Sequence, residues 1–116
     1  MRRESGAILQ YLVDKYDPTH KISVTGVEEK YDQLKWLFFQ SSGQGPYFGQ
    51  VAWFLFYHPE KVPSALERYR NETKRVFGVL ESVLSKQEWL VGGKATVADI
   101  SFVSYVVVIV WIVFCL

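Results

Sequence analysis

The chain has 116 residues, of which 49% are apolar and 16% aromatic, and its formal net charge at pH 7 is +1. This length indicates one domain with enough apolar side chains for a core, and the balanced charge excludes a nucleic-acid-binding protein that relies on neutralising many phosphates. The single cysteine excludes an internal disulfide and a multi-cysteine metal site, so we expect no metal cofactor.

The first expected element is a helix in the segment SGAILQYLVDKYD. Ser5 is expected to be its N-cap, because the serine hydroxyl can accept a hydrogen bond from a free N–H group of the first turn. The Asp17-Pro18 pair ends the helix, since proline disfavours helical backbone in the residue before it. The helical spacing of apolar residues is carried by Ile8, Leu9, Leu12 and Tyr16.

A longer helix is expected from Val27 to about Ser42. The following segment, SSGQGPYFGQ, contains glycines and Pro46, which are expected to break or kink the helix. A second helical segment is then expected in the aromatic-rich YFGQVAWFLFY, and it ends before Pro59. The apolar face of the longer helix is predicted to contain Tyr31, Leu34, Leu37 and Phe38.

The segment SALERYRNETKRVFGVLESVLSK predicts an amphipathic helix, with Pro63 at its start, where a missing N–H costs nothing. Residues 91–94 are expected to form a turn, and Thr96 then opens the last helix. No segment alternates convincingly with a period of two, so the sequence predicts an all-α fold without a confident strand. The apolar stripe of the amphipathic helix is Ala65, Tyr69, Thr73, Val76, Leu80 and Val83.

The residues alone reveal no catalytic constellation. The sequence offers no metal-ligand cluster and no supported Ser/His/Asp set. The segment GQGPYFGQ lies between helical segments and lacks the lysine and the preceding strand of a nucleotide-binding loop. We therefore predict no catalytic residue in this chain.

Three segments, taken together, resemble glutathione transferases: ESGAILQYLVDKY, WLFFQSSGQGPYFGQVAWFLFYHPEKVPSALERYRNETKRVFGVLE and ATVADISFV. The second is similar to the nitrogen-regulator-like branch of the fungal enzymes, akin to the bacterial nu class. The resemblance covers about residues 4–104. It implies a helical bundle of the transferase C-terminal-domain type over residues 27–116. Residues 1–17 would be a remnant, the last helix, of a missing thioredoxin-like domain.

The resemblance also implies a glutathione-binding site at Glu4 and Ser5. A helix N-terminus presents free N–H groups and partial positive charge, which suit the γ-glutamyl carboxylate of glutathione. Ser5 would bind this carboxylate, and Glu4 would lie beside the γ-glutamyl amine. The alternative is that Ser5 is a plain N-cap.

Further residues have expected roles in the helical part. Arg68 and Arg75 would either approach glutathione across a dimer or lie on a solvated helix face. Thr96 and Asp99 are predicted to form a capping box for folding, in which each side chain accepts the backbone N–H of the other residue. Candidates for a hydrophobic-substrate cleft, with core packing as the alternative, are Tyr47, Phe48, Gln50 and Trp53.

The resemblance implies a fragment of a protein that conjugates small electrophiles to glutathione or carries out thiol–disulfide chemistry with it. We expect the chain to be inactive alone, because the thioredoxin-like half is missing. A cytoplasmic homodimer is also implied. Two alternatives stay open: a non-enzymatic helical dimerisation or interaction module, and a tail-anchored membrane protein with residues 100–116 as the anchor.

Both ends of the sequence depart from the resemblance. Residues 1–3 abut the Glu-Ser pair abruptly, and Tyr105–Leu116 is almost uniformly apolar, without a counterpart in the family. We expect a partial gene product, or a reading frame that continues into non-coding sequence. The apolar tail is expected to complete the last helix.

Overall fold

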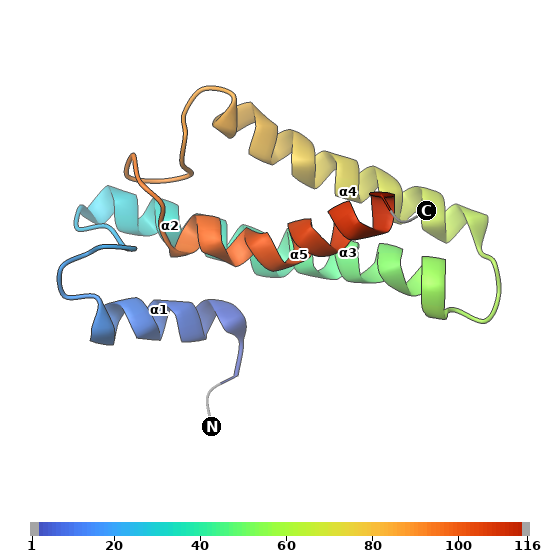
Figure 1. Ribbon diagram of the computed structural model, residues 1–116, viewed down its shortest axis with the longest axis horizontal. Helices are drawn as coiled ribbons and strands as arrows, with labels where there is room; N and C mark the ends of the chain where they lie inside the picture. Colours follow the sequence, from blue (N-terminus) through green and yellow to red (C-terminus); the bar gives the residue numbers. More distant parts are fainter. Residues whose placement is uncertain (1–2, 115–116) are drawn as a thin grey trace.

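The computed structural model describes residues 3–114, with side chains described up to Val107, as a set of packed helices (Figure 1). Two π-helical turns, η1 (Gln40–Gln44) and η2 (Trp53–Tyr57), follow α2 and α3. This described part contains no strand, which confirms the all-α prediction. The α-helices are α1 (Ser5–Tyr16), α2 (Val27–Phe39), α3 (Gly45–Ala52), α4 (Pro63–Leu84) and α5 (Val97–Phe114).

Helix α5 is the central helix of the arrangement. It packs against α1, α2 and α3, while α4 packs against α3. In Figure 1, α1 and α4 lie on opposite sides of the layer that contains α2, α3 and α5. The prediction that Thr96 opens a helix of the core is therefore confirmed.

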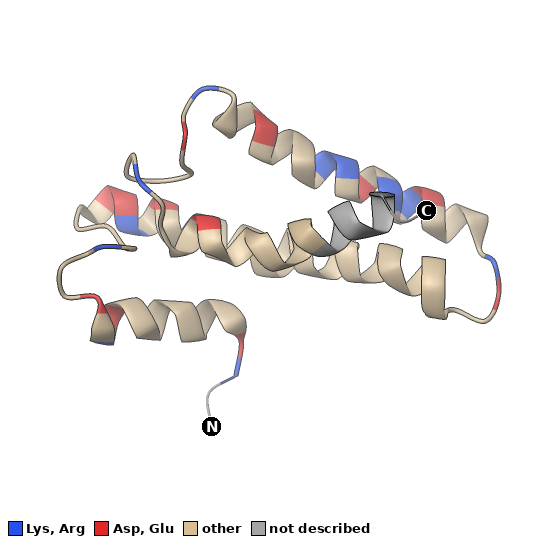
Figure 2. Ribbon diagram, viewed as in Figure 1, with Lys and Arg blue, Asp and Glu red and all other residues tan. Residues whose placement is uncertain are grey.

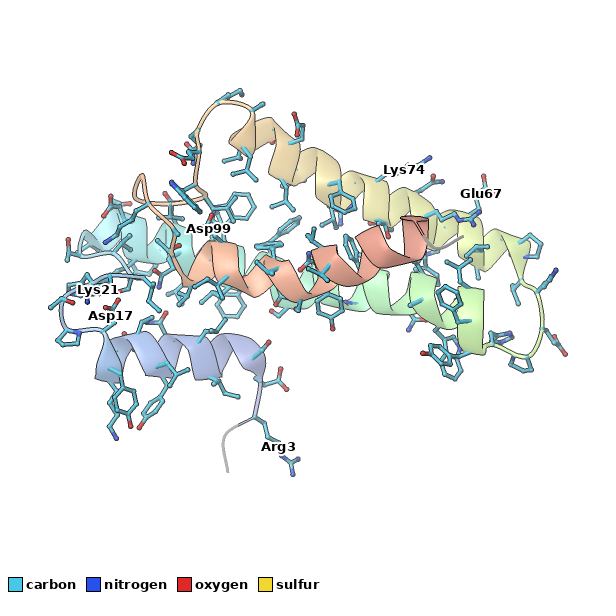
Figure 3. All side chains as sticks on the ribbon, in the orientation of Figure 1. Arg3, Asp17, Lys21, Glu67, Lys74 and Asp99 are labelled. Atoms are coloured by element: carbon cyan, nitrogen blue, oxygen red, sulfur yellow. The ribbon has the colours of Figure 1, made fainter. Side chains whose placement is uncertain are left out.

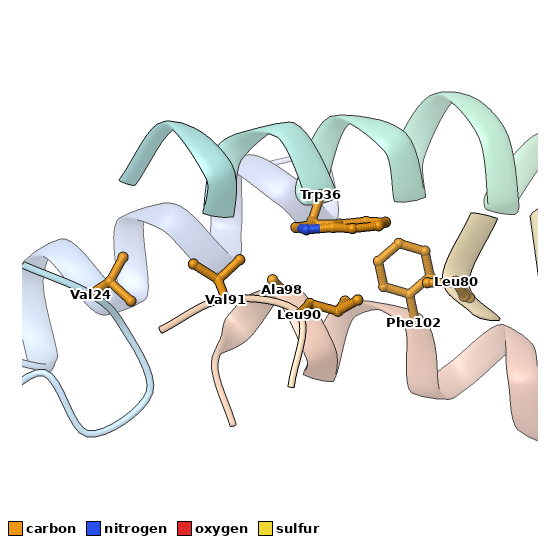
Figure 4. Packing of buried hydrophobic residues seen from close by; sticks show 7 residues of the cluster. All are labelled: Val24, Trp36, Leu80, Leu90, Val91, Ala98 and Phe102. Atoms are coloured by element: carbon orange, nitrogen blue, oxygen red, sulfur yellow. The ribbon is translucent and has the colours of Figure 1, made fainter. Parts of the chain in front are cut away.

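The largest part of the core joins α2, α4, α5 and the loops that precede α2 and α5 (Figure 4). The rings of Trp36 and Phe102 meet edge to face, with their centroids 6.1 Å apart, a geometry that aromatic quadrupoles favour. This packing fixes α5 against α2. The cluster contains Val24, Trp36, Leu80, Leu90, Val91, Ala98 and Phe102.

The glycine-rich segment, which was predicted to break or kink the helix, does not break it. The chain stays helical over residues 27–57, with η1 between α2 and α3. The ring of a proline inside an α-helix clashes with the carbonyl four residues earlier, and the wider π-turn before Pro46 relieves this crowding. The hydroxyls of Ser41 and Ser42 donate to the carbonyl oxygen of Phe38 at 3.1 and 2.8 Å, so this carbonyl is paired where the helical ladder changes.

The predicted stripe of α4 is confirmed, since Thr73, Val76 and Leu80 are buried. The predicted face of α2 is only partly buried. Leu37 lies in the core, whereas Tyr31 and Phe38 are 67% and 69% exposed. These two exposed rings give α2 an apolar surface outside the core.

The middle of the chain, from Trp36 to Pro59, contains no Asp, Glu, Lys or Arg. Figure 2 shows this stretch as an uncharged run through α3, whereas α4 carries residues of both signs. Any polar recognition by η1 and α3 must therefore come from neutral side chains and the backbone.

Candidate functional site

Helix α1 begins at a strained residue. Glu4 has φ 67° and ψ 110°, and its carbonyl oxygen accepts the N–H of Ile8 at 3.0 Å, so Glu4 is the N-cap. The prediction that Ser5 is the N-cap is wrong, because the sharp turn at Glu4 makes Ser5 the first helical residue. A positive φ at a non-glycine residue costs about 1–3 kcal/mol, and residues with such strain cluster at functional sites.

The N–H groups at the start of α1 are left open. Among the described residues, no side chain caps them, and the first turn of α1 contains no acidic residue. These groups carry the partial positive charge of the helix dipole, so they suit a carboxylate. Ser5 is exposed, and its hydroxyl is available to the same ligand.

A surface pocket of about 330 Å³ lies at this helix start. Three further segments complete it: η1, the first residues of α3, and α5. Of the seven residues that line it, five have polar side chains, so the pocket suits a polar ligand. The lining residues are Glu4, Ser5, Gln40, Ser41, Gly45, Pro46 and Tyr105.

None of the four residues expected to line a hydrophobic cleft lines this pocket, and their exposure differs. Phe48 is 2% exposed in the core, which agrees with the packing alternative. Tyr47 is half-buried against α4, and Gln50 is exposed. Trp53 is 48% exposed and stacks on Tyr57 with ring centroids 6.0 Å apart. The structure does not bring them to the pocket at the start of α1.

Arg68 and Arg75 are both exposed on α4. The Nε atom of Arg75 lies 2.7 Å from a carboxylate oxygen of Glu72, and its guanidinium lies 5.8 Å from the ring centroid of Tyr47. The hydrogen bond with Glu72 raises the pKa of Arg75. Tyr47 and Arg75 are thus neighbours, but neither lines the pocket at the start of α1.

Thr96 and Asp99 cap α5 (Figure 3 labels Asp99). The N–H and the hydroxyl of Thr96 donate to Oδ2 of Asp99 at 2.9 and 3.1 Å. The Thr96 hydroxyl oxygen accepts the N–H of Ala98 at 3.2 Å, not that of Asp99, which corrects one bond of the predicted box. Oδ1 of Asp99 also accepts the N–H of Leu90 at 2.9 Å, so one carboxylate ties the preceding loop to the helix.

A second carboxylate, Asp17, organises the loop after α1 (Figure 3). It accepts the N–H groups of Lys21 and Ile22 at 2.7 and 3.0 Å and the hydroxyl of Ser23 at 2.8 Å. Burial opposes ionisation of Asp17, but these three hydrogen bonds outweigh it and lower the pKa of the carboxyl below its usual value. The sequence predicted only that the helix ends there.

Sequence reasoning missed three residues beside the pocket. Gln40 donates through Nε2 to Oε1 of Gln44 at 3.4 Å, and Gln44 donates through Nε2 to the carbonyl oxygen of Phe102 at 3.1 Å. Both glutamines are buried. Two glutamines four residues apart within an uncharged helical run are a signal that could have found this pair. Tyr105 was hidden because it begins the apolar tail.

The sequence matches the family described as "Glutathione S-transferase, C-terminal domain" over residues 46–111. A curated relative, the glutathione S-transferase-like protein tpcF of Aspergillus fumigatus, is 50% identical over 95% of this chain and 53% of its own length. Two similar proteins of known structure come from Phanerochaete chrysosporium. Glutathione transferase URE2P6, in complex with oxidised glutathione, is 71% identical with a TM-score of 0.86 over 90% of this chain and 48% of its own. Ure2p5, cocrystallised with 1-(S-glutathionyl)-2,4-dinitrobenzene, is 56% identical with a TM-score of 0.86 over 91% of this chain and 49% of its own.

The chain therefore spans about half the length of the relatives it matches. These matches confirm the predicted resemblance to the nitrogen-regulator-like (Ure2p-type) branch of the fungal glutathione transferases. They also confirm the predicted helical bundle of the transferase C-terminal-domain type. The comparisons support neither the interaction module nor the tail-anchored protein. Within the described residues, we find no helix with the length and apolarity needed to cross a bilayer. The last two residues of the tail, 115–116, lie outside them.

Proposed function

The chain belongs to the glutathione S-transferase C-terminal domain family, and from this premise we propose that it is the helical part of a transferase-like protein that binds glutathione at the start of α1. One observation carries the site: the open helix N-terminus at Ser5 lies in a pocket of polar side chains. The oxidised glutathione and the glutathionyl conjugate in the two solved neighbours support the ligand.

In this proposal the γ-glutamyl carboxylate accepts hydrogen bonds from the first N–H groups of α1 and from the Ser5 hydroxyl. Glu4, which is exposed beside them, pairs with the γ-glutamyl amine. The strained backbone of Glu4 supports this role, because strained residues cluster at functional sites and Glu4 itself lines the pocket. The ligand is a substrate, and no metal is invoked.

The activity proposed for the whole protein is conjugation of glutathione to small electrophiles, or thiol–disulfide exchange with it. Helix α1 would be the last helix of a thioredoxin-like domain that supplies the groups for thiolate activation. Tyr47, Gln50 and Trp53 stay candidates for the electrophile side, whereas Phe48 is buried. The 116 residues alone are expected to bind glutathione weakly and to show no turnover.

The test is glutathione binding by the chain and by its Ser5→Ala variant, measured by NMR titration. We expect the affinity to fall at least about tenfold, because a hydrogen bond to a charged group is worth about 1.5–3 kcal/mol. Ser64→Ala is the matched control, since Ser64 is also an exposed serine in the first turn of a helix. Equal binding by wild type and Ser5→Ala contradicts the site. Turnover of 1-chloro-2,4-dinitrobenzene above the Ser5→Ala level contradicts the expected inactivity.

We also propose a homodimer, which the resemblance places in the cytoplasm, formed through the outer face of α2. Val27, Tyr31 and Phe38 are 67–69% exposed there, and together with Leu34 they follow the spacing of four and three residues typical of paired helices. Exposed apolar patches of this kind usually mark an interaction surface. Light scattering at tens of micromolar should give the dimer mass, and Phe38→Asp should lower it. A monodisperse wild-type monomer contradicts this proposal.

A further inference from the structure

Tyr105 of α5 is one of the residues that line the pocket at the start of α1. Ninety-nine residues lie between Ser5 and this tyrosine in the sequence, and the packing of α5 against α1 brings the two helices together. Tyr105 therefore faces the same space as the open helix start, although the sequence places it at the beginning of an apolar tail.

The geometry of Tyr105 leaves its hydroxyl available to a ligand. Its half-buried ring packs edge to face on Phe48, with centroids 6.4 Å apart and an interplanar angle of 87°. Within the described part of the chain, no hydrogen-bond partner of the hydroxyl occurs. Gly45 lies opposite it: a Cβ atom at this position would lie 3.7 Å from the Tyr105 hydroxyl oxygen. The missing side chain of Gly45 keeps the space before the hydroxyl free.

The wall of the pocket is held in place by buried amides. Gln40 lines the pocket and donates to Gln44, which in turn donates to the Phe102 carbonyl oxygen at 3.1 Å. Phe102 lies three residues before Tyr105 on α5, and thus nearly one helical turn away. This link joins η1 to the turn that carries Tyr105, so the hydroxyl is positioned before a ligand arrives, which lowers the entropic cost of binding.

The chemistry of the lining indicates which part of a ligand Tyr105 meets. Among the described residues that line this pocket, Glu4 alone is charged, and the other polar groups are neutral hydroxyls and an amide. A phenolic O–H donates to carbonyl or carboxylate oxygens, which the tripeptide supplies and an apolar electrophile lacks. We propose, building on the function proposed above, that the Tyr105 hydroxyl is a further glutathione-binding group. It donates a hydrogen bond to an oxygen of the peptide bound at Ser5.

Tyr105→Phe is the direct test, because it removes the hydroxyl and keeps the ring on Phe48. In an NMR titration with reduced glutathione, we expect the affinity of the full chain to fall about three- to tenfold, the usual value of one hydrogen bond. The midpoint of thermal unfolding should not change. Tyr57→Phe is the matched control, since Tyr57 is 70% exposed and lies outside the pocket. It should bind like wild type.

Gly45→Ala is a second variant that does not depend on Tyr105→Phe. It places a methyl group before the hydroxyl, and alanine is favoured over glycine in a helix, so binding should weaken while the fold is kept. If Ser5→Ala weakens binding and Tyr105→Phe does not, the role of Tyr105 is wrong and the proposed function stands. If the wild-type chain shows no binding, both proposals fail.

Discussion

The N-termini of α1 and α5 differ in whether side chains of the same chain pair with their free backbone N–H groups. At the start of α5, Thr96 and Asp99 provide hydrogen bonds within the chain, and Thr96 is fully buried. At the start of α1, Glu4 and Ser5 are exposed, and no side chain caps the free N–H groups among the described residues. Both sequences contain a hydroxyl residue and an acid near a helix start, and only their arrangement differs.

The order of the two residues explains the difference. In α5 the hydroxyl residue comes first and the acid follows three residues later, so the carboxylate can reach back to the cap. In α1 the acid comes immediately before the serine, at the N-cap itself, and its side chain makes no capping hydrogen bond. A filled helix start stabilises the fold, whereas an open one retains affinity for an anion.

The largest expected effect is the loss of stability when the side-chain cap at the N-terminus of α5 is removed. Asp99→Ala removes the acceptor of three hydrogen bonds, from Thr96 twice and from Leu90. The free energy of unfolding should fall by about 3 kcal/mol, more than an exposed cap is worth, because buried donors lose their partners. Denaturant-induced unfolding followed by circular dichroism measures this change.

Ser5→Ala is the control at the open start. Its hydroxyl bonds to no cap N–H, so the free energy of unfolding should change by less than about 0.5 kcal/mol. If Asp99→Ala and Ser5→Ala lowered the free energy of unfolding by similar amounts, the proposed difference between the two helix N-termini would be contradicted.

A smaller effect is expected at the strained residue. Glu4→Gly should raise the free energy of unfolding by about 1 kcal/mol, because glycine adopts a positive φ without a steric cost. The same change should weaken glutathione binding through loss of the carboxylate. Glu4→Gln separates the two effects: it keeps the strain and removes the charge. A loss of stability in Glu4→Gly would show that the backbone of Glu4 is not strained.

The smallest effect concerns pH and the other end of α1. The pKa of Asp17 is lowered in the folded chain, so its contribution is present above the unfolded pKa of about 4 and is lost as the pH falls through the folded value. Asp17→Asn should therefore reduce stability at pH 7 and flatten its fall below pH 4. Unfolding midpoints between pH 2 and 7 measure this, and parallel pH profiles for the two chains would contradict it.

Much of the fold could be predicted from local sequence rules. The stripe of α4, the end of α1 at Asp17 and the cap of α5 depend on residues close together in the chain. The continuity of the helix through Pro46 could not, because the π-turn depends on local crowding that composition does not report. The exposed rings of α2 were missed, since periodicity marks an apolar face but not what covers it.

The site was predictable only in part. Glu4 and Ser5, which line the pocket, were expected at the site because their pattern resembles a family motif. Gln40 and Tyr105 join them through contacts among distant segments, which one sequence without an alignment does not show. The expected cleft residues were chosen because they follow the glycine-rich segment. An aromatic residue at such a position can equally belong to the core, as Phe48 does.

The central claim is that the start of α1 is an open anion site, whereas the start of α5 is filled. A titration of the ¹⁵N-labelled chain with reduced glutathione tests it directly, with each backbone amide followed by NMR. The account predicts that the largest shifts occur at the amides of Ser5 and Gly6, while the amide of Ala98 at the start of α5 does not move. Shifts that centre elsewhere, or no shifts up to tens of millimolar glutathione, would contradict it.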